Sequence, residues 1–209
     1  FENIEENFEK LENEILNSDV IAIGPGIGKS QQAFSIFEKL INIEKNNKGN
    51  TIKLVLDADA LNLLAENREL FEKIRNRSVL TPHLVEFSRL TGFSPEVINK
   101  NKFEIAKEFS KKYGIILLLK GKNTIITNGE ELFANSTGNS HMANGGMGDC
   151  LTGIICSLAG QKYDLMKSAL IGAYLHGKIA DELVRRQYTV NATDVIDNIS
   201  KYMNKIFKI

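Results

Sequence analysis

Four short, mostly apolar runs, separated by segments with helical spacing, constrain the fold of this chain more than any other feature. They occupy residues 20–23, 52–56, 78–81 and 115–120. A continuous apolar run predicts a strand that is covered on both faces, as in a parallel sheet. Strands that alternate with helices are joined by right-handed βαβ crossovers, which put helices on both faces of the sheet. The sequence therefore predicts a layered α/β fold.

The segments between these runs carry the spacing of amphipathic helices. In the first segment, apolar residues recur at alternating steps of four and three and so share one helical face. They are Phe1, Ile4, Phe8, Leu11 and Ile15. Further helices are predicted over residues 30–41, 84–91 and 99–113, and one more begins near Asp59.

The pattern changes after the fourth strand. Residues 124–127 and 130–135 flank Asn128-Gly129, a dipeptide that suits both φ > 0 positions of a type I′ turn and so predicts a β-hairpin. A glycine-rich loop follows, and the rest of the chain has helical spacing. Because the sequence contains no linker and no internal repeat, residues 1–209 are predicted to form a single domain.

Charge and composition exclude several classes of protein. The chain has 26 Lys and Arg against 26 Asp and Glu, so it lacks the basic excess of a nucleic-acid-binding protein. Its most apolar stretches are far shorter than the ~20 residues that span a membrane. Cys150 and Cys156 form no CxxC motif, and no histidine pair has metal-ligand spacing. We therefore expect a cytoplasmic protein with no nucleic-acid or membrane partner and no metal site built from its own side chains.

A glycine-rich turn follows the first predicted strand, at residues 24–28. It is not a phosphate-binding P-loop, because Ile23 stands where that motif has its first glycine. It is not a dinucleotide fingerprint either, because Lys29 stands where the third glycine would be. It nevertheless joins a strand to a helix at the carboxyl edge of the sheet, where ligands bind in open α/β folds. Both a ligand-binding turn and a purely structural turn fit these residues.

The strongest chemical signal is the loop at residues 144–149, which leads into a helix. Gly145, Gly146 and Gly148 let successive backbone N–H groups converge on an anion, and the helix N-terminus adds partial positive charge. Phosphate chemistry is the natural use of such a site. Asp149 would then accept a proton from a hydroxyl group near the phosphate, or it would only cap the helix.

Two further strands end in polar residues that should lie at the same edge of the sheet. Asp57 and Asp59 follow the second strand, and His83 follows the third. At least one carboxylate is expected at this edge, where it could help to position a metal ion or a ligand hydroxyl group, whereas Asp59 fits a helix cap better. His83 is either a hydrogen-bonded structural residue or a functional group.

Together these motifs resemble the NAD(P)H-hydrate dehydratases, over about residues 20–191. Five motifs occur in the order and spacing of that family. They are Gly24-Pro25-Gly26-Ile27-Gly28, Leu56-Asp57-Ala58-Asp59-Ala60-Leu61-Asn62, Thr81-Pro82-His83 with Glu86, Lys120-Gly121 with Thr124, and Gly145-Gly146-Met147-Gly148-Asp149 with Leu151-Thr152-Gly153. The family has a ribokinase-like fold, so the resemblance implies a three-layer αβα sandwich with a mostly parallel sheet and a β-hairpin.

The resemblance implies a repair enzyme, a lyase that returns hydrated NADH or NADPH to the normal cofactor. The hydroxyl group of the hydrate would be phosphorylated at the expense of ADP or ATP, with Mg²⁺, and phosphate would then be eliminated. Phosphate is a far better leaving group than hydroxide, so the protein mainly positions the reactants and stabilises charge. ADP is the favoured donor and a homo-oligomer is implied, although the residues separate neither ADP from ATP nor the two hydrates.

The matching positions assign roles to individual residues by this resemblance. Gly26, Gly28 and His83 would contact the hydrate, and Asp149 would contact it as the base on its hydroxyl group. The adenine nucleotide would be held by Lys120, Gly121, Lys122, Asn123, Thr124, Gly145, Gly146 and Gly148.

The chain departs from the family pattern at three places. Leu84-Val85 stands where the family usually has Pro-Gly, and Met147 stands where it usually has Thr or Ser. Family members also carry an additional N-terminal segment with a glycine-rich strand and a substrate-contacting alanine, which nothing before Phe1 supplies. We therefore expect the N-terminal strands of the sheet to be missing from this chain.

Two other functions fit part of the sequence. A small-molecule kinase of the same fold would use the same nucleotide site, although residues 24–28 and Thr81-Pro82-His83 favour the dehydratases. A nucleotide-binding module without catalysis would result if the N-terminal segment were essential for activity.

Overall fold

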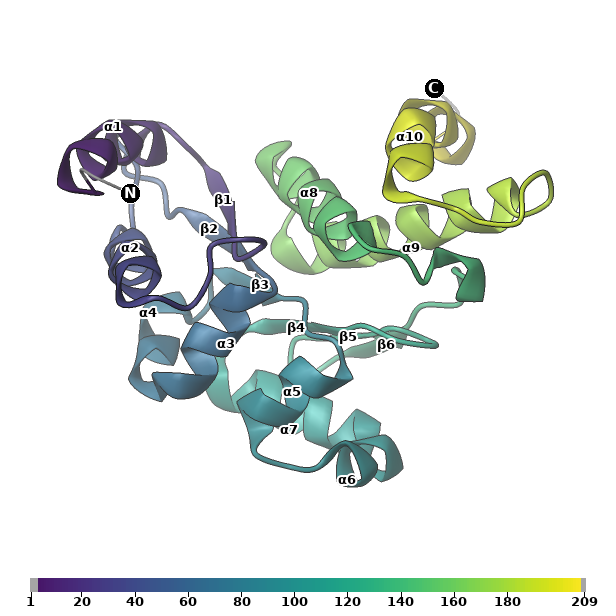
Figure 1. Cartoon of the computed structure of the whole chain (residues 1–209), viewed down its shortest axis with the longest axis horizontal. Helices are drawn as coiled ribbons and strands as arrows, with labels where there is room; N and C mark the ends of the chain where they lie inside the picture. The colour runs from purple at the N-terminus through teal and green to yellow at the C-terminus, as the bar shows by residue number, and fades with distance from the viewer. Residues whose placement is uncertain (1–3, 208–209) are drawn as a thin grey trace.

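A six-stranded sheet forms the middle layer of the structure (Figure 1). Its strands follow chain order: β1 (Val20–Ile23), β2 (Lys53–Leu56), β3 (Ser78–Leu80), β4 (Ile116–Leu119), β5 (Ile125–Thr127) and β6 (Leu132–Ala134). The first four strands are parallel, and β5 and β6 extend the sheet as an antiparallel hairpin. The computed structural model describes residues 4–207, so Phe1 of the first predicted helix lies outside the described residues. The prediction of a mostly parallel sheet with a hairpin is confirmed.

Helices cover both faces of this sheet. One layer contains α1 (Ile4–Leu16), α2 (Gln31–Asn42), α3 (Asp59–Glu66), α4 (Phe71–Ile74), α5 (Leu84–Thr91), α6 (Pro95–Lys100) and α7 (Lys102–Tyr113). The other contains α8 (Met147–Gly160) and α9 (Leu165–Leu183), with α10 (Ala192–Phe207) packed against them. Short 3₁₀ turns cover Arg68–Leu70 and Ser140–Met142. The three-layer αβα sandwich is therefore confirmed.

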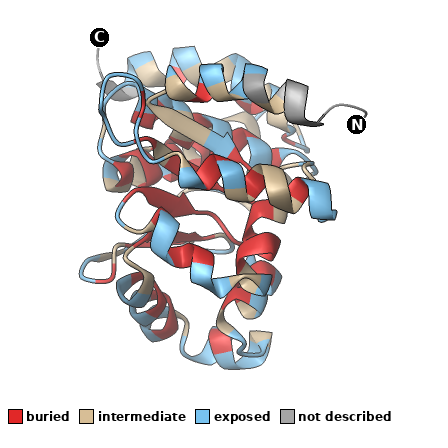
Figure 2. Ribbon diagram, turned by 90° about the vertical axis from the view of Figure 1, so that its left-hand side faces the viewer, coloured by how far each residue is buried: buried red, intermediate tan, exposed pale blue. Residues whose placement is uncertain are grey.

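Successive side chains of the central strands point to opposite faces and build two apolar cores. Leu54 and Leu56 of β2 pack with the layer that contains α2 and α3, whereas Val55 packs with α8 and α9. Buried residues fill most of β2 to β5 and the inner faces of the helices (Figure 2). Close packing on both faces holds the strand ends in place, and the loops of the candidate site emerge from those ends.

β1 is less covered than its sequence predicts. Val20 and Ile21 are only partly buried and Ala22 is exposed, so the expectation of a strand buried on both faces is wrong here. The reason is its place at the edge of the sheet, where β2 is its only strand partner among residues 4–207. An edge of this kind presents backbone groups that can pair with another strand.

The region predicted as one helix over residues 99–113 contains two helices. α6 ends at Lys100 and α7 starts at Lys102, with Asn101 between them in a non-helical conformation. The apolar spacing continues across this break, because both helices bury residues in the same core. A break of one residue leaves that periodicity almost unchanged, so the sequence pattern did not reveal it.

The hairpin turn also differs from its prediction. β5 and β6 are joined by a four-residue loop in which Gly129 has φ of 90° and Asn128 does not have positive φ, so the turn is not type I′. Asn128 instead accepts hydrogen bonds at Oδ1 from the backbone N–H groups of Glu130 and Glu131. The hydrogen bonds of the Asn128 side chain therefore close this loop, in place of the expected type I′ backbone turn.

A buried arginine ties helices of the first layer to the amino end of the sheet. Arg77 directly precedes β3, and its guanidinium group donates hydrogen bonds to the carbonyl oxygens of Lys73 (2.9 Å), Ile52 (2.9 Å) and Ile41. Burial lowers the pKa of this group, and Glu44 opposes that shift. Removing the guanidinium group would leave three carbonyl groups without their donor.

We expect Arg77→Met to lower the free energy of unfolding by about 3 kcal/mol, because buried carbonyl groups would lose their hydrogen-bond partners. Urea denaturation followed by circular dichroism measures the change. Arg75→Met is the matched control, since Arg75 is only partly buried: its guanidinium group pairs with Glu72 and donates a hydrogen bond to the carbonyl oxygen of Lys112 near the surface, where such contacts contribute little. Equal destabilisation by the two substitutions would contradict the role assigned to Arg77.

Candidate active site

The first glycine turn joins β1 to α2 at the carboxyl edge of the sheet. It packs so closely on β2 that a Cβ atom on Gly24 would lie 1.7 Å from the carbonyl oxygen of Asp57. Gly26 and Gly28 have φ of 74° and 77°, in the left-handed region that favours glycine. The backbone N–H of Gly28 donates a 3.0 Å hydrogen bond to Oδ2 of Asp59. The turn is therefore fixed by the loop that follows the neighbouring strand.

This contact corrects the prediction for Asp59. Asp59 is the first residue of α3 and not its cap; the N-cap position is Ala58, with φ of 49° and no capping side chain. Oδ2 of Asp59 accepts the hydrogen bond from the glycine turn, and Oδ1 accepts one from Asn62 Nδ2 at 3.4 Å. Its role is to join two loops of the sheet edge.

Asp57, which follows β2, carries a buried charge. The residue is 1% exposed, and its Oδ1 accepts hydrogen bonds from Lys120 Nζ at 2.7 Å and from the backbone N–H of Ala58 at 2.9 Å. Its Oδ2 accepts a hydrogen bond from Thr152 Oγ1 at 3.0 Å. A carboxylate was expected at this edge of the sheet, but its two side-chain partners come 63 and 95 residues later in the chain. Only its position after a strand pointed to Asp57.

α8 begins at the second glycine loop. Gly146 is its N-cap, with φ of 82°, and no side chain caps the helix, so the interpretation of Asp149 as a cap is wrong. A Cβ atom on Gly148 would lie 3.3 Å from Lys120 Nζ and 3.4 Å from Oδ2 of Asp57. The first turn of α8 thus lies over the buried ion pair. Its uncapped N–H groups and the nearby ammonium group form an arrangement that binds anions.

A cavity of about 610 Å³ opens on one side of this turn, and we call it the nucleotide cavity after the predicted nucleotide-binding residues in its wall. It is lined by six of the predicted nucleotide-binding residues: Lys120, Gly121, Lys122, Asn123, Thr124 and Gly148. The facing wall is the loop before α8, which Asp181 of α9 holds by accepting hydrogen bonds from Gly138 N (3.0 Å) and Asn139 Nδ2 (2.8 Å). The volume is that of a small-molecule or cofactor site.

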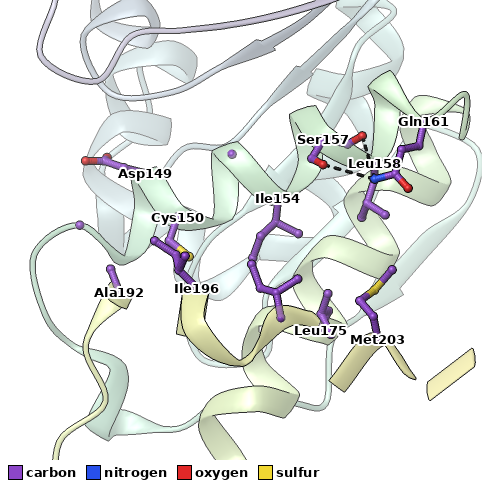
Figure 3. Close-up of a pocket in the computed structure, with 13 residues that line it drawn as sticks. Asp149, Cys150, Ile154, Ser157, Leu158, Gln161, Leu175, Ala192, Ile196 and Met203 are labelled. Atoms are coloured by element: carbon purple, nitrogen blue, oxygen red, sulfur yellow. Dashed lines mark hydrogen bonds between the residues drawn. The ribbon is translucent and has the colours of Figure 1, made fainter. Parts of the chain in front are cut away.

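An apolar groove of about 420 Å³ lies on another side of α8, between α8 and α10, and we call it the α8–α10 groove (Figure 3). Asp149 stands at one end and Gln161 at the other, with Ile154 and Leu158 of α8 between them. Asp149 borders this groove and not the nucleotide cavity. Of the two remaining predicted glycines, Gly146 also lines the groove, whereas Gly145 lines neither space.

His83 has a structural role at the start of α5. Its Nδ1 accepts hydrogen bonds from the backbone N–H groups of Val85 (3.1 Å) and Glu86 (3.3 Å), which puts the ring proton on Nε2. Nε2 lies 3.4 Å from Oε1 of Glu86, and about half of the side chain is exposed. The loop is joined to β4 by the 2.8 Å hydrogen bond from Lys120 N to the carbonyl oxygen of Pro82. His83 itself lines neither the cavity nor the groove, and its imidazole is held at the start of α5.

Lys102, at the start of α7, is a further cation near the loop predicted to bind the nucleotide, and the sequence motifs did not single it out. A Cβ atom on Gly121 would lie 3.9 Å from its Nζ. Burial lowers the pKa of this ammonium group. Among the described side chains, no carboxylate forms a salt bridge with it. Only its position at a helix start on the carboxyl edge of the sheet would have indicated it.

Other chemistries have little support at this site. Within residues 4–207, no group of three or more His, Cys, Asp or Glu is arranged to hold a metal ion. Cys150 and Cys156 are free, and burial raises the pKa of both thiols, so neither is an activated nucleophile. In the part of the chain that the structure describes, we find no helix with the length and apolar character of a membrane span.

The sequence matches the family described as NAD(P)H-hydrate dehydratase over residues 2–201. The chain belongs to this family. Its relatives include the ADP-dependent (S)-NAD(P)H-hydrate dehydratase of Listeria monocytogenes, which is 30% identical over 204 residues, 97% of this chain and 68% of that protein. The chain spans about a third of the length of the first curated relatives that it matches, which are bifunctional NAD(P)H-hydrate repair enzymes.

Solved structures agree with this dehydratase family. A ribokinase-like superfamily protein of Enterococcus faecalis has a TM-score of 0.83 at 31% identity, covering 96% of this chain and 68% of that one. The ADP/ATP-dependent NAD(P)H-hydrate dehydratase of Bacillus subtilis, co-crystallised with ATP and Mg²⁺, has a TM-score of 0.74 at 26% identity, with 92% and 69% covered. The ribokinase-like fold is confirmed.

A buried histidine of this dehydratase-family chain lies in the wall of the nucleotide cavity. His176, on α9, is 8% exposed, and its Nε2 has no hydrogen-bond partner within the described residues. Burial lowers its pKa to about 4, although a backbone hydrogen bond with Met147 opposes the shift. The imidazole is therefore neutral when the protein is folded at neutral pH.

We expect His176 to make the protein less stable in acid. As the pH falls below about 6.5, the unfolded chain binds a proton at this histidine, whereas the folded protein binds it only near pH 4. The contribution of the neutral imidazole to the free energy of unfolding is present in full above pH 6.5. It is lost toward pH 4, by up to about 3 kcal/mol. In urea unfolding between these pH values, His176→Gln should lose stability less steeply than the wild type. If the free energies of unfolding of the two proteins changed equally with pH, His176 would not be the cause of the loss.

Proposed function

We propose that this chain is a lyase that dehydrates hydrated NADH or NADPH, with an adenine nucleotide as the phosphoryl donor, and that residues 1–209 act as one domain. The observation that carries the proposal is the first turn of α8, where the nucleotide cavity, the uncapped helix N-terminus over Lys120, and Asp149 meet. Membership of the NAD(P)H-hydrate dehydratase family and the names of its relatives support the same reaction.

The adenine nucleotide binds in the nucleotide cavity, with its phosphates directed to the start of α8. Its ligands are Lys120, Gly121, Lys122, Asn123, Thr124 and Gly148, while Gly145 and Gly146 shape the backbone that leaves the helix N–H groups free. Positive charge from the helix terminus and from Lys120 attracts the phosphates. ADP is the favoured donor, in line with the name of the Listeria relative.

The phosphates of the nucleotide would bring Mg²⁺ to this site. This ion usually binds to substrate phosphates and to one or two protein carboxylates, so a preformed cluster of protein ligands is not required. Asp57 lies near the phosphate position but already accepts three hydrogen bonds, which leaves it little capacity as a ligand. When bound, Mg²⁺ neutralises charge on the transferred phosphoryl group.

The reaction has two stages, and Asp149 acts in the first. Asp149 takes the proton of the hydrate's hydroxyl group as the oxygen attacks the terminal phosphorus, and AMP or ADP leaves with the electron pair of the broken bond. In the second stage the C–O bond breaks, phosphate leaves with its electron pair, and the neighbouring carbon loses a proton to water as the ring double bond forms. Gly26, Gly28 and His83 bind the hydrate during both stages.

Additional polypeptide completes the site in this proposal. The outer edge of β1 has no strand partner among the described residues, and the α8–α10 groove leaves apolar surface beside Asp149. An N-terminal segment that adds a strand to β1 would cover that edge, the chain connected to the strand would cover the groove, and a homo-oligomer would cover further surface. The two free cysteines agree with the reducing cytoplasm in which we place the enzyme.

Two alternative functions use the same nucleotide cavity. A small-molecule kinase would release a stable phosphorylated product and would not restore the absorbance of NADH from its hydrate. A nucleotide-binding module without catalysis would bind ADP tightly but show no turnover with either hydrate. One assay separates all three: incubation with NADH hydrate and either ADP or ATP, followed at the absorbance of the reduced nicotinamide.

We expect Asp149→Asn to lower kcat by at least about 100-fold, because general-base catalysis contributes roughly that much or more. ADP affinity, measured by calorimetry, should change little, since Asp149 acts on the hydrate and only in the transition state. Asp164→Asn is the matched control, because Asp164 caps α9 away from the cavity and the groove. A variant at Asp149 with wild-type kcat would rule out this residue as the base, and tight ADP binding without turnover in either protein would favour the non-catalytic module.

A further inference from the structure

Lys120 lies at the floor of the nucleotide cavity and is held there by Asp57, which a ligand in the cavity would not contact. Asp57 lies 2.7 Å from its Nζ and does not line the cavity, whereas Lys120 does. The side chain of Asp57 is 2% exposed and that of Lys120 is 20% exposed. The ion pair therefore has a buried end at Asp57 and an accessible end at the ammonium group.

We propose that Asp57 is a positioning residue of the nucleotide site, which fixes the ammonium group of Lys120 beneath Gly148 so that it meets a phosphate at the start of α8. The inference rests on the proposed binding of an adenine nucleotide in this cavity. It extends that proposal by assigning a role to a residue that would touch neither the nucleotide nor the hydrate.

The carboxylate of Asp57 is itself rigidly held, as an anchor must be. Ala58 N donates to one oxygen and Thr152 Oγ1 donates to the other, at 2.9 and 3.0 Å. The residue that carries the ammonium group is also fixed, because Lys120 N donates to the carbonyl oxygen of Pro82. A lysine has a flexible stem and a strongly hydrated charge. Without its anchor, the partly exposed ammonium group of Lys120 would turn toward water.

Thr152 extends the same anchor to the helix that presents the N–H groups. It lies on α8 one turn after Gly148, and its hydroxyl group is buried against Asp57. The distances of 3.3 and 3.4 Å from a Cβ atom on Gly148 to Lys120 Nζ and Asp57 Oδ2 show how closely the helix start lies over the pair. One carboxylate therefore sets the positions of both groups that would contact the phosphate.

Two possible roles of Asp57, as a negative charge and as an anchor of Lys120, predict opposite effects of Asp57→Asn on nucleotide affinity. If net charge alone governed nucleotide binding, Asp57→Asn would remove a negative charge near the phosphates and tighten binding. If Asp57 acts by holding Lys120, the same substitution frees the ammonium group and weakens binding. The direction of the change therefore tests the proposal.

The test is a double-mutant cycle on ADP affinity, measured by isothermal titration calorimetry. We expect Asp57→Asn to raise the ADP dissociation constant about tenfold, the scale of a lost charge-assisted hydrogen bond. Lys120→Met should weaken binding at least as much, and the double variant should bind no more weakly than Lys120→Met alone, because Asp57 acts through Lys120. Asp19→Asn is the matched control, since it breaks a surface pair with Lys162 at 2.6 Å and should leave ADP affinity unchanged.

Unchanged or tighter ADP binding by Asp57→Asn would overturn the proposal. A double variant whose ADP dissociation constant rises by the product of the factors for Asp57→Asn and Lys120→Met would overturn it as well. If the wild type binds neither ADP nor ATP, the proposed function fails and this inference fails with it. Normal binding by the wild type with no effect of Asp57→Asn overturns the inference alone.

A second pair of variants covers the case in which Asp57→Asn does not fold. Thr152→Val keeps the shape of the side chain but removes the hydroxyl group that fixes Oδ2 of Asp57, and Thr152→Ser keeps that hydroxyl group. We expect the valine variant to bind ADP about threefold more weakly, as for one modest hydrogen bond, and the serine variant to bind like the wild type. Equal ADP affinities of the two variants would contradict the role of Asp57 as an anchor.

Discussion

The buried ion pair between Asp57 and Lys120 is the interaction on which the candidate site depends. It joins the ends of β2 and β4 across the intervening β3, and Thr152 connects α8 to the same carboxylate. A carboxylate this deeply buried is stable only when charge and hydrogen bonds compensate it. These segments cannot separate without leaving an unpaired charge in the interior. The cavity floor and the helix N-terminus therefore behave as one rigid unit.

The first turn of α8 divides the proposed reaction between two spaces. Gly148 borders the nucleotide cavity, and Asp149, the next residue, borders the α8–α10 groove. Successive residues of a helix point about 100° apart, so one turn can face a donor on one side and an acceptor on the other. A phosphate held by the N–H groups at this turn would lie between the two. This arrangement gives a physical reason for a glycine and an aspartate at consecutive positions.

Patterns within a few residues predicted most of the fold, whereas the main errors at the candidate site come from contacts between distant residues. Apolar runs and glycine positions depend on local geometry, so the sheet, its hairpin and the start of α8 followed from them. Asp59 was expected to cap its own helix because nothing in the sequence indicates that Gly28 would offer it an N–H group. The partners of Asp57 were likewise hidden, because they are brought to it only by the parallel order of the strands. Family resemblance named the site residues but not these contacts.

The proposed function includes an added segment, and the position of the α8–α10 groove gives that proposed segment a physical role. Asp149 at its end is exposed, and a phosphoryl acceptor beside an open groove would compete with water. β1 and α8 are in contact, so a strand paired to the free edge of β1 would continue the sheet beside α8. The chain that leads to or from such a strand would then lie over the apolar side of α8. Pairing at the sheet edge and exclusion of water from Asp149 would thus be achieved by the same piece of polypeptide.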